Sequence, residues 1–109
     1  MGITQVVAIV RDDKLERVEE HLKNMHVRGL SVSHIKGYGE YADFFSHNWM
    51  TTHVRIDVFT DGARVDEIVQ TIVDAAHTGV PGDGLVAVLP VSSVIRIRTK
   101  AVAAPEELA

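Results

Sequence analysis

The hydrophobic positions of this chain change their spacing several times, and each change predicts a new element. A continuous apolar run over residues 5–10 predicts a strand that is covered on both faces. Asp12 and Asp13 then supply the carboxylates that favour the start of a helix. Apolar residues follow at spacings of three and four, the pattern of one helical face: Leu15, Val18, Leu22 and Met25. Alternating, β-branched residues over 30–36 predict a second strand.

The second half of the chain repeats this order. Strict alternation over 52–60 predicts a third strand, with Val54, Ile56 and Val58 on one face and Arg55, Asp57 and Phe59 on the other. Asp61 is an N-cap candidate for a helix whose apolar stripe runs from Val65 to Ala76, with Gly79 as the C′ residue after it. Residues 85–89 predict a fourth strand and residues 94–98 a short fifth strand, while 101–109 is expected to be a frayed tail.

This order of elements predicts one α+β domain over residues 1–109, with a ferredoxin-like βαββαβ fold, a short extra C-terminal strand and a flexible tail over 100–109. Residues 37–51 have no sustained periodicity and are expected to form a loop between strands two and three. Such a sheet carries both helices on one face, yet the apolar strands 5–10 and 85–89 also require cover on the other. Further copies of the chain are the simplest cover, so we expect a homo-oligomer.

Composition narrows the classes of function. The 109 residues include no cysteine, which excludes disulfides and thiolate metal sites and fits a cytoplasmic location. The net charge of −4 argues against non-specific nucleic-acid binding, and no apolar run is long enough to insert into a membrane. No Ser-His-Asp set, carboxylate pair or metal motif stands at a useful spacing, so we do not expect an enzyme.

The richest candidate chemistry lies between residues 78 and 99. A glycine-bracketed acidic turn, Gly82-Asp83-Gly84, precedes an apolar run that ends in alternating isoleucine and arginine. If residues 94–98 form a strand, Arg96 and Arg98 project from one face. Two guanidinium groups beside a loop where glycine lets the backbone approach would suit an oligophosphate. The alternative is a solvated strand face beside an ordinary turn.

Several segments together resemble the PII signal transduction family. They are the TGVPGDG run over 78–84 and the IRIRT run over 95–99, with RGLSV at 28–32, KGYG at 36–39 and DKL at 13–15. The resemblance implies a homotrimer with adenine nucleotides in the clefts between subunits. It also implies a long loop, here 37–51, that docks on a protein target such as a membrane transporter or a metabolic enzyme.

The resemblance also implies roles for individual residues. The backbone of Gly82, Asp83 and Gly84 would hold phosphates and ribose, and Arg96 and Arg98 would reach the phosphates from a neighbouring subunit. The remaining expected nucleotide-binding positions surround the base or let the loop base fold over the phosphates: Ile9, Gly29, Ser31, Asp57, Phe59, Gly37 and Gly39.

The chain departs from the family pattern at positions where typical members carry a positive charge. Leu85 stands where typical members have a lysine after the acidic turn, and Glu40-Tyr41 stand where they have Arg-Gln. The loop is also shorter and lacks the tyrosine segment that is uridylylated. We therefore expect ADP or AMP to be favoured, with ATP and cyclic AMP as alternatives and bicarbonate as a second signal in inorganic-carbon metabolism. The other hypotheses are a nitrogen-regulatory sensor of ATP and ADP, and a metal-binding or structural trimer.

Two residue groups leave alternatives open. The six histidines lack metal-ligand spacing, so no metal site is expected, although a trimer could gather three copies of His47 or His53 on its axis. The aromatic residues of the loop suit either a docking surface or a small core that closes the loop: Tyr41, Phe44, Phe45 and Trp49.

Overall fold

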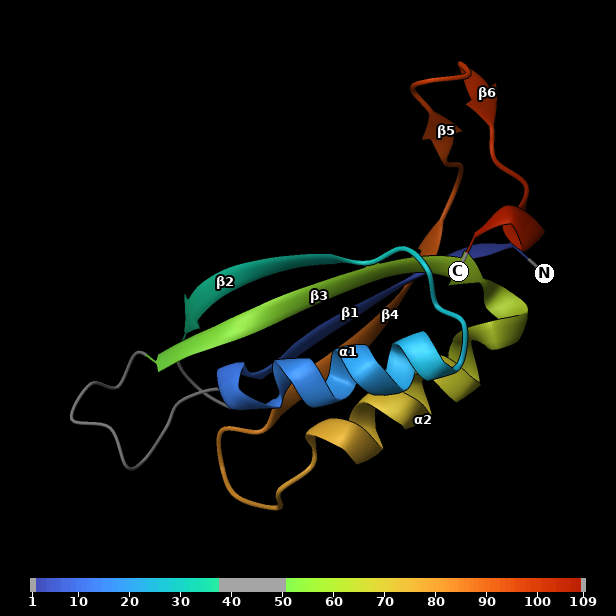
Figure 1. Cartoon of the computed structure of the whole chain (residues 1–109). Coiled ribbons are helices and arrows are strands. Elements are labelled where there is room, and N and C mark those ends of the chain that lie inside the picture. The colour runs from blue at the N-terminus through green and yellow to red at the C-terminus, as the bar shows by residue number, and fades with distance from the viewer. Residues whose placement is uncertain (1, 38–50, 109) are drawn as a thin grey trace.

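The elements occur in the order that the hydrophobic pattern predicts (Figure 1). The computed structural model describes residues 2–37 and 51–108. Strand β1 (Ile3–Arg11) leads through a 3-10 turn, η1 (Asp12–Lys14), into helix α1 (Leu15–Asn24). After it come β2 (Ser31–Gly37), β3 (Thr51–Asp61), the 3-10 turn η3 (Gly62–Arg64), α2 (Val65–Ala76) and β4 (Gly84–Val91). The expected loop lies between β2 and β3, and residues 38–50 of it are outside the described part.

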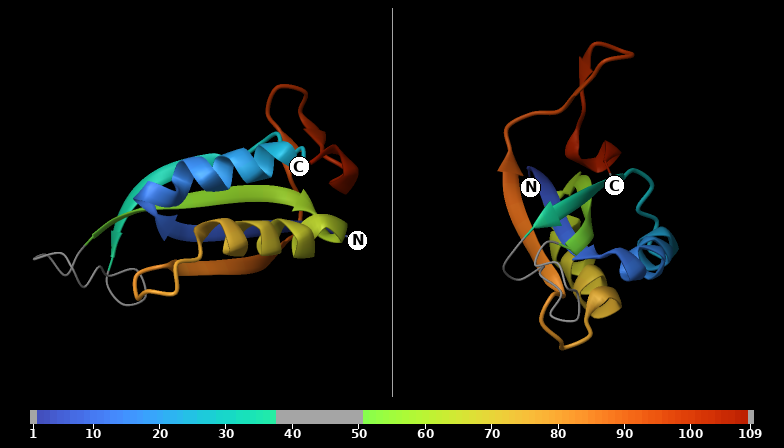
Figure 2. Two further views of the ribbon diagram at one scale, coloured as in Figure 1. Left: turned by 60° about the horizontal axis from the view of Figure 1, so that its bottom comes forward. Right: turned by 90° about the vertical axis from the view of Figure 1, so that its left-hand side faces the viewer.

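The four long strands form one antiparallel sheet in the order β2-β3-β1-β4. This order confirms the ferredoxin-like fold that the sequence predicts. Both helices lie on the same face of the sheet, as the two views of Figure 2 show. The register places Val6 of β1 opposite Val58 of β3 and Val88 of β4.

The core lies between the helices and the inner face of the sheet. The predicted inner row of β3, Val54, Ile56 and Val58, is fully buried. It packs in one cluster with the helical stripes, whose fully buried members are Val18, Leu22, Ile68 and Ile72. Each such side chain contributes roughly 1.5–3 kcal/mol by leaving water, so this cluster fixes which way each strand faces.

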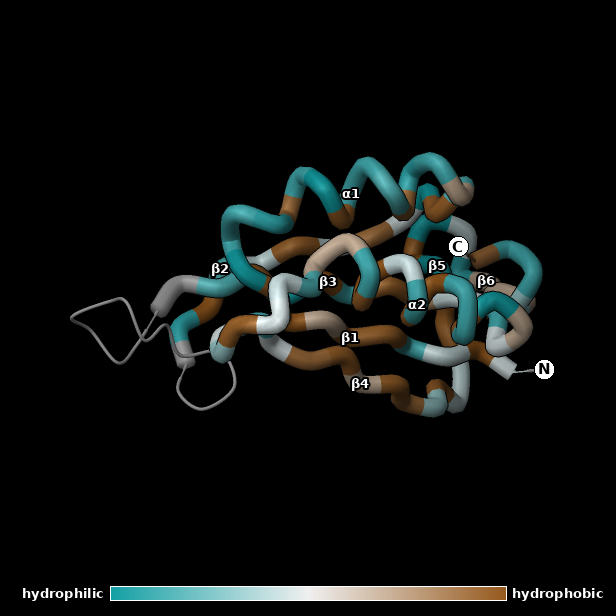
Figure 3. The backbone as a smooth tube through the Cα atoms, turned by 90° about the horizontal axis from the view of Figure 1, so that it is seen from below, coloured by the Kyte–Doolittle hydropathy of each residue, from teal (hydrophilic) through white to brown (hydrophobic). Residues whose placement is uncertain are grey.

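The face of the sheet opposite α1 and α2 is only partly covered in the single chain. Phe59 of β3 is 39% exposed, and Leu85 and Leu89 of β4 are 43% and 41% exposed. The register puts all three on the face opposite the helices, and β1 and β4 are predominantly hydrophobic along their length (Figure 3). The expectation of a second apolar face is therefore confirmed.

The C-terminal region differs from the expected single strand and frayed tail. β5 (Ile95–Arg96) pairs with β6 (Ala101–Val102) in a separate two-stranded sheet. The two strands and the turn between them form an arm, residues 95–102, which projects from the body beyond β4 (Figure 1). The strand predicted over 94–98 ends at Arg96 because the chain reverses through residues 97–100, where Lys100 has a left-handed φ of 59°. Ala103 is then only 3% exposed, and η4 (Pro105–Glu107) follows.

The boundaries of α2 refine two expectations. Asp61 caps the 3-10 turn η3 that leads into α2, since its side chain accepts a hydrogen bond from the Ala63 N–H, whereas the N-cap position of α2 itself is Arg64. The helix ends at Ala76 with His77 as its C-cap, so Gly79, predicted as the C′ residue, lies one residue beyond that position. Across the residues described, neither helix has the length and apolar character that crossing a bilayer requires.

Candidate functional site

The loop between α2 and β4 is organised around one carboxylate. Asp83 accepts hydrogen bonds from the backbone N–H groups of Thr78 and Gly79, each at 2.9 Å, and from the Thr78 hydroxyl. Arg11 of β1 adds an ion pair, with its Nε 3.0 Å from Oδ1. The Asp83 side chain therefore points into its own loop and satisfies donors there, which is how an aspartate between glycines shapes a turn.

These contacts set the charge of Asp83. Partial burial taken alone would raise the pKa of the carboxyl. The hydrogen bonds from Thr78 and Gly79 and the contact with Arg11 outweigh it and hold the pKa of Asp83 well below its usual range. The loop thus carries a carboxylate that is ionised at any physiological pH and is already engaged by its neighbours.

Two further contacts attach this loop to the ends of the central strands. Arg11 donates from Nη2 to the carbonyl oxygens of Pro81 at 2.6 Å and Val80 at 3.3 Å. Buried His53, which is paired with Arg11 in the β1–β3 register, places its Nε2 2.9 Å from the Gly82 carbonyl oxygen. Neither residue is part of the motif that marks the loop, and sequence reasoning did not assign either to the site.

Glycine is required at both ends of the acidic turn. Gly82 and Gly84 have φ angles of 102° and 97°, in the region that favours glycine. A Cβ on Gly84 would also stand 1.8 Å from the carbonyl oxygen of Ile9. Ile9, Asp83, Gly84 and Leu85 are among the residues that line a small cavity of about 180 Å³ between α2 and the edge of the sheet.

A larger cavity, of about 690 Å³, collects most of the remaining predicted residues. Its walls include Gly29 and Ser31 from the segment that leads into and begins β2, Asp57 and Phe59 from the outer side of β3, and Arg96 from the arm. These positions are far apart in sequence, and the fold brings them to one place.

One wall of this cavity is held by a polar network on the outer face of β3. Arg55 contacts Asp57 through two hydrogen bonds of 3.0 and 3.1 Å, and Gln5 donates to the same carboxylate at 2.9 Å. Asp57 is thus fixed by its neighbours on β1 and β3. The hydrogen bond with Asp57 raises the pKa of Arg55.

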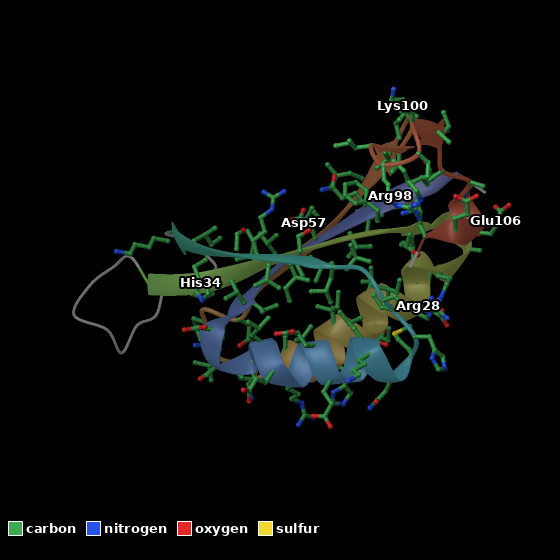
Figure 4. The ribbon with its side chains drawn as sticks, turned by 45° about the horizontal axis from the view of Figure 1, so that its top comes forward. Arg28, His34, Asp57, Arg98, Lys100 and Glu106 are labelled. Atoms are coloured by element: carbon green, nitrogen blue, oxygen red, sulfur yellow. The ribbon has the colours of Figure 1, made fainter. Side chains whose placement is uncertain are left out.

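Charged side chains of both signs surround the larger cavity. His26, Arg28, Arg64 and Arg96 supply cationic or protonatable groups, and Glu106 and Glu107 of η4 supply carboxylates. Arg64 donates to Glu67 at 2.7 Å and to the Met25 carbonyl oxygen at 2.6 Å. Figure 4 shows Arg28 and Glu106 at the same end of the molecule, beside the arm that carries Arg98. Sequence reasoning missed Arg28 and Arg64 as members of the cavity because neither stands in a charge motif.

The predicted nucleotide-binding residues thus fall into two groups within one chain. Gly29, Ser31, Asp57, Phe59 and Arg96 share the larger cavity, and Ile9, Asp83 and Gly84 share the smaller one.

The other predicted positions lie outside both groups. Arg98 lies in the turn of the arm and does not share a strand face with Arg96, which corrects the expectation from alternation. Gly37 ends β2, and Gly39 is outside the described residues, as are Glu40, His47 and the loop aromatics. Across residues 2–37 and 51–108, no three His, Asp or Glu side chains cluster as a metal site would require.

Comparisons with known proteins find a matching family model and several similar sequences. The family model described as nitrogen regulatory protein P-II matches residues 3–101. The nitrogen regulatory protein P-II of Synechocystis is 36% identical over 107 residues, covering 87% of this chain and 91% of the relative. GlnK of Escherichia coli K12 is 36% identical, with coverage of 86% and 90%.

A plant relative matches in both sequence and structure. The P-II homolog of Arabidopsis thaliana is 34% identical over 87% of this chain, which spans only 53% of that longer protein. The crystal structure of Arabidopsis thaliana PII bound to citrate superposes with a TM-score of 0.80 at 33% identity, covering 94% of this chain and 89% of that one.

Proposed function

The chain belongs to the nitrogen regulatory protein P-II family, and from that membership we propose that it is a trimeric sensor of adenine nucleotides. Members of this family are regulatory signalling proteins. In this chain, ADP or AMP binds between subunits in preference to ATP. Binding then alters the loop between β2 and β3 and so the surface that a target protein meets.

The observation that carries this proposal is the composition of the larger cavity. Its backbone wall at Gly29 and Ser31 offers main-chain groups, Phe59 offers an aromatic surface and Arg96 offers a guanidinium group. A purine base needs an apolar face with main-chain partners, and a phosphate needs a fork of N–H donors. The volume of about 690 Å³ is within the range of cavities that hold small ligands.

The separation of the two groups supports a site between subunits. The acidic turn borders the smaller cavity, which is separate from the larger one in a single chain, and a nucleotide that bridged two copies would contact both. The outer sheet face and the arm are apolar and exposed, as expected of surfaces that a neighbouring subunit covers. A homotrimer accounts for both features.

The charges present favour a ligand with few phosphates. Leu85 follows the acidic turn directly and cannot neutralise an outer phosphate, and Glu106 and Glu107 add negative charge to the larger cavity. In sequence, Glu40 adds another carboxylate near the loop base. Each further phosphate therefore adds repulsion from these carboxylates.

Calorimetric titration with ATP, ADP, AMP and cyclic AMP tests the proposal. We expect micromolar binding of ADP or AMP, weaker binding of ATP, and at least about a tenfold loss of affinity in Arg96→Ala, since a charge-assisted hydrogen bond contributes about 1.5–3 kcal/mol. Arg17→Ala removes an exposed arginine from α1, outside the cavity, and should bind as the wild type does.

Repeating the titrations with bicarbonate, 2-oxoglutarate and citrate separates the branches of the proposal. Tightening by bicarbonate would support a role in inorganic-carbon metabolism. Tight ATP binding that 2-oxoglutarate enhances would contradict the preference for ADP or AMP and identify a nitrogen-regulatory sensor instead. Absence of nucleotide binding would leave a structural or metal-binding trimer as the better description.

A further inference from the structure

The C-terminal turn brings carboxylates to the cavity in which we place the nucleotide. Glu106, Glu107 and Leu108 line that cavity together with Arg96. Arg96 donates from Nη2 to the backbone carbonyl oxygen of Glu107 at 3.3 Å, and its Nε lies 3.9 Å from Oε2 of the Glu107 side chain. The guanidinium group that would receive a phosphate is therefore already engaged by an internal anion.

The turn is held in this place by ordered backbone contacts. The Ala103 N–H donates to the Val94 carbonyl oxygen at 2.8 Å, which joins the chain after β6 to the chain before β5. The Glu107 N–H donates to Ala104 at 3.0 Å, which closes η4, and Pro105 restricts its backbone at the first position. Because Ala103 is buried, the carboxylates are presented from an anchored segment.

Other cations of the cavity offer limited compensation. Arg64 is occupied by Glu67 and by the Met25 carbonyl oxygen. Arg28 is exposed and makes no hydrogen bond or ion pair with the residues that the structure describes, so it remains available to a ligand. The guanidinium group of Arg28 is thus available to balance the two carboxylates of Glu106 and Glu107. Each negative charge that a ligand adds increases the repulsion from these carboxylates.

We propose that Glu106 and Glu107 are specificity-determining residues: Glu107 competes with anionic ligands for Arg96, and both carboxylates select against nucleotides with more phosphates. The proposal rests on the proposed function, because it concerns the same cavity. A nucleotide must either displace the Glu107 carboxylate from Arg96 or bind beside both carboxylates. On either route both carboxylates stay near the ligand, so the repulsion rises from AMP to ATP and is absent for an uncharged nucleoside.

The test compares Glu106→Gln/Glu107→Gln with the wild-type chain by calorimetry, using adenosine, AMP, ADP and ATP. Removing two like charges at a partly exposed site should tighten ATP binding by about two- to tenfold, since one exposed charge pair changes affinity by at most about fivefold. The gain should be smaller for ADP, smaller again for AMP and absent for adenosine. It should also shrink at high ionic strength, because salt screens the repulsion.

The matched control is Glu16→Gln/Glu20→Gln on the exposed side of α1. It changes the net charge by the same amount, but neither residue lines the cavity. Circular dichroism confirms that all three proteins are folded. The expected result is a gain that depends on ligand charge in the Glu106/Glu107 variant alone.

Every other result of these titrations either supports or overturns the inference about Glu106 and Glu107. Equal affinities in the wild type and both variants would overturn this inference and leave the proposed function intact. An equal gain in both variants would show a general effect of net charge and would also overturn it. Binding that appears only after the Glu106/Glu107 substitution would support it strongly. Absence of binding in all three proteins would overturn both this inference and the proposed function.

Discussion

At the scale of single residues, Asp83 decides the shape of the loop between α2 and β4. One carboxylate collects two backbone N–H groups, a hydroxyl and the guanidinium group of Arg11. Arg11 also binds two carbonyl oxygens of the loop, and His53 contacts a third. We expect this loop to bind phosphates. It is held by the carboxylate of its own Asp83 and by two side chains from the strands, Arg11 and His53.

We expect Asp83→Asn to lower the free energy of unfolding by about 1–3 kcal/mol, the effect expected when hydrogen bonds to a charged group are weakened. The amide keeps one acceptor oxygen but loses the charge that Arg11 needs. Urea denaturation at pH 7 measures the difference. Asp13→Asn changes an exposed aspartate of η1 and should stay within about 0.5 kcal/mol of the wild type.

The same variant has a defined pH dependence. Because the pKa of Asp83 is lowered in the folded chain, its contribution is complete above the unfolded value of about 3.9 and is lost as the pH falls below it. The stability gap between the wild type and Asp83→Asn should therefore be constant near neutrality and shrink below about pH 4. A gap that does not shrink under acid would contradict the assigned role of the carboxylate.

At the scale of elements, the β5–β6 arm is too small to be stable by itself. A two-stranded hairpin is marginal in water, and its apolar side chains here do not form a core. Ile97 in its turn is 92% exposed, and Ile95 and Val102 are also largely exposed. An arm of this kind gains stability by packing its isoleucines on another surface, and in the proposed trimer a neighbouring subunit would offer one.

We expect Ile97→Asp to weaken association between subunits by at least about tenfold, or 1.4 kcal/mol, while the far-UV circular dichroism stays unchanged. The exposed side chain has no role in the core of its own chain, so only an intersubunit contact can be lost. Sedimentation equilibrium over a concentration series measures the effect. Asn24→Asp, at the exposed end of α1, adds the same charge outside both cavities and is the matched control, and equal weakening in both variants would contradict a specific role of the arm.

At the scale of the whole molecule, the two helices α1 and α2 cover only one of the two faces of the sheet. The outer residues of β3 and β4 include Phe59, Leu85 and Leu89, which are all partly exposed. The outer part of β3 nearer the loop is polar, with Arg55 and Asp57 paired to each other. An apolar area bordered by polar side chains is typical of an interface between subunits, which has an apolar core and a polar rim.

We expect light scattering to give a solution mass of about three times the 12.0 kDa of one chain. Leu89→Arg, which places a charge in the apolar area, should reduce that mass to the value of one chain at micromolar concentration. Gln70→Arg, on the exposed side of α2, should leave the larger mass unchanged. A wild-type mass of one chain would contradict both the trimer and the site between subunits.

The sequence by itself determined the elements and the direction in which each one faces. Alternation placed Val54, Ile56 and Val58 inward and Phe59 outward, and the stripes of α1 and α2 identified most of the buried helical residues. These properties follow from the local geometry of the backbone, with period two in strands and 3.6 in helices, so the order of residues records them directly. The family pattern around Gly82-Asp83-Gly84 is equally local.

Only the tertiary structure decided which of these residues meet. It separated Arg96 from Arg98 by turning the chain between them, directed the Asp83 carboxylate into its own loop, and brought Glu107 to Arg96. It also joined Arg11 and His53 to a loop some thirty to seventy residues away. Such contacts depend on how packed elements place distant side chains, and sequence spacing carries no record of that placement.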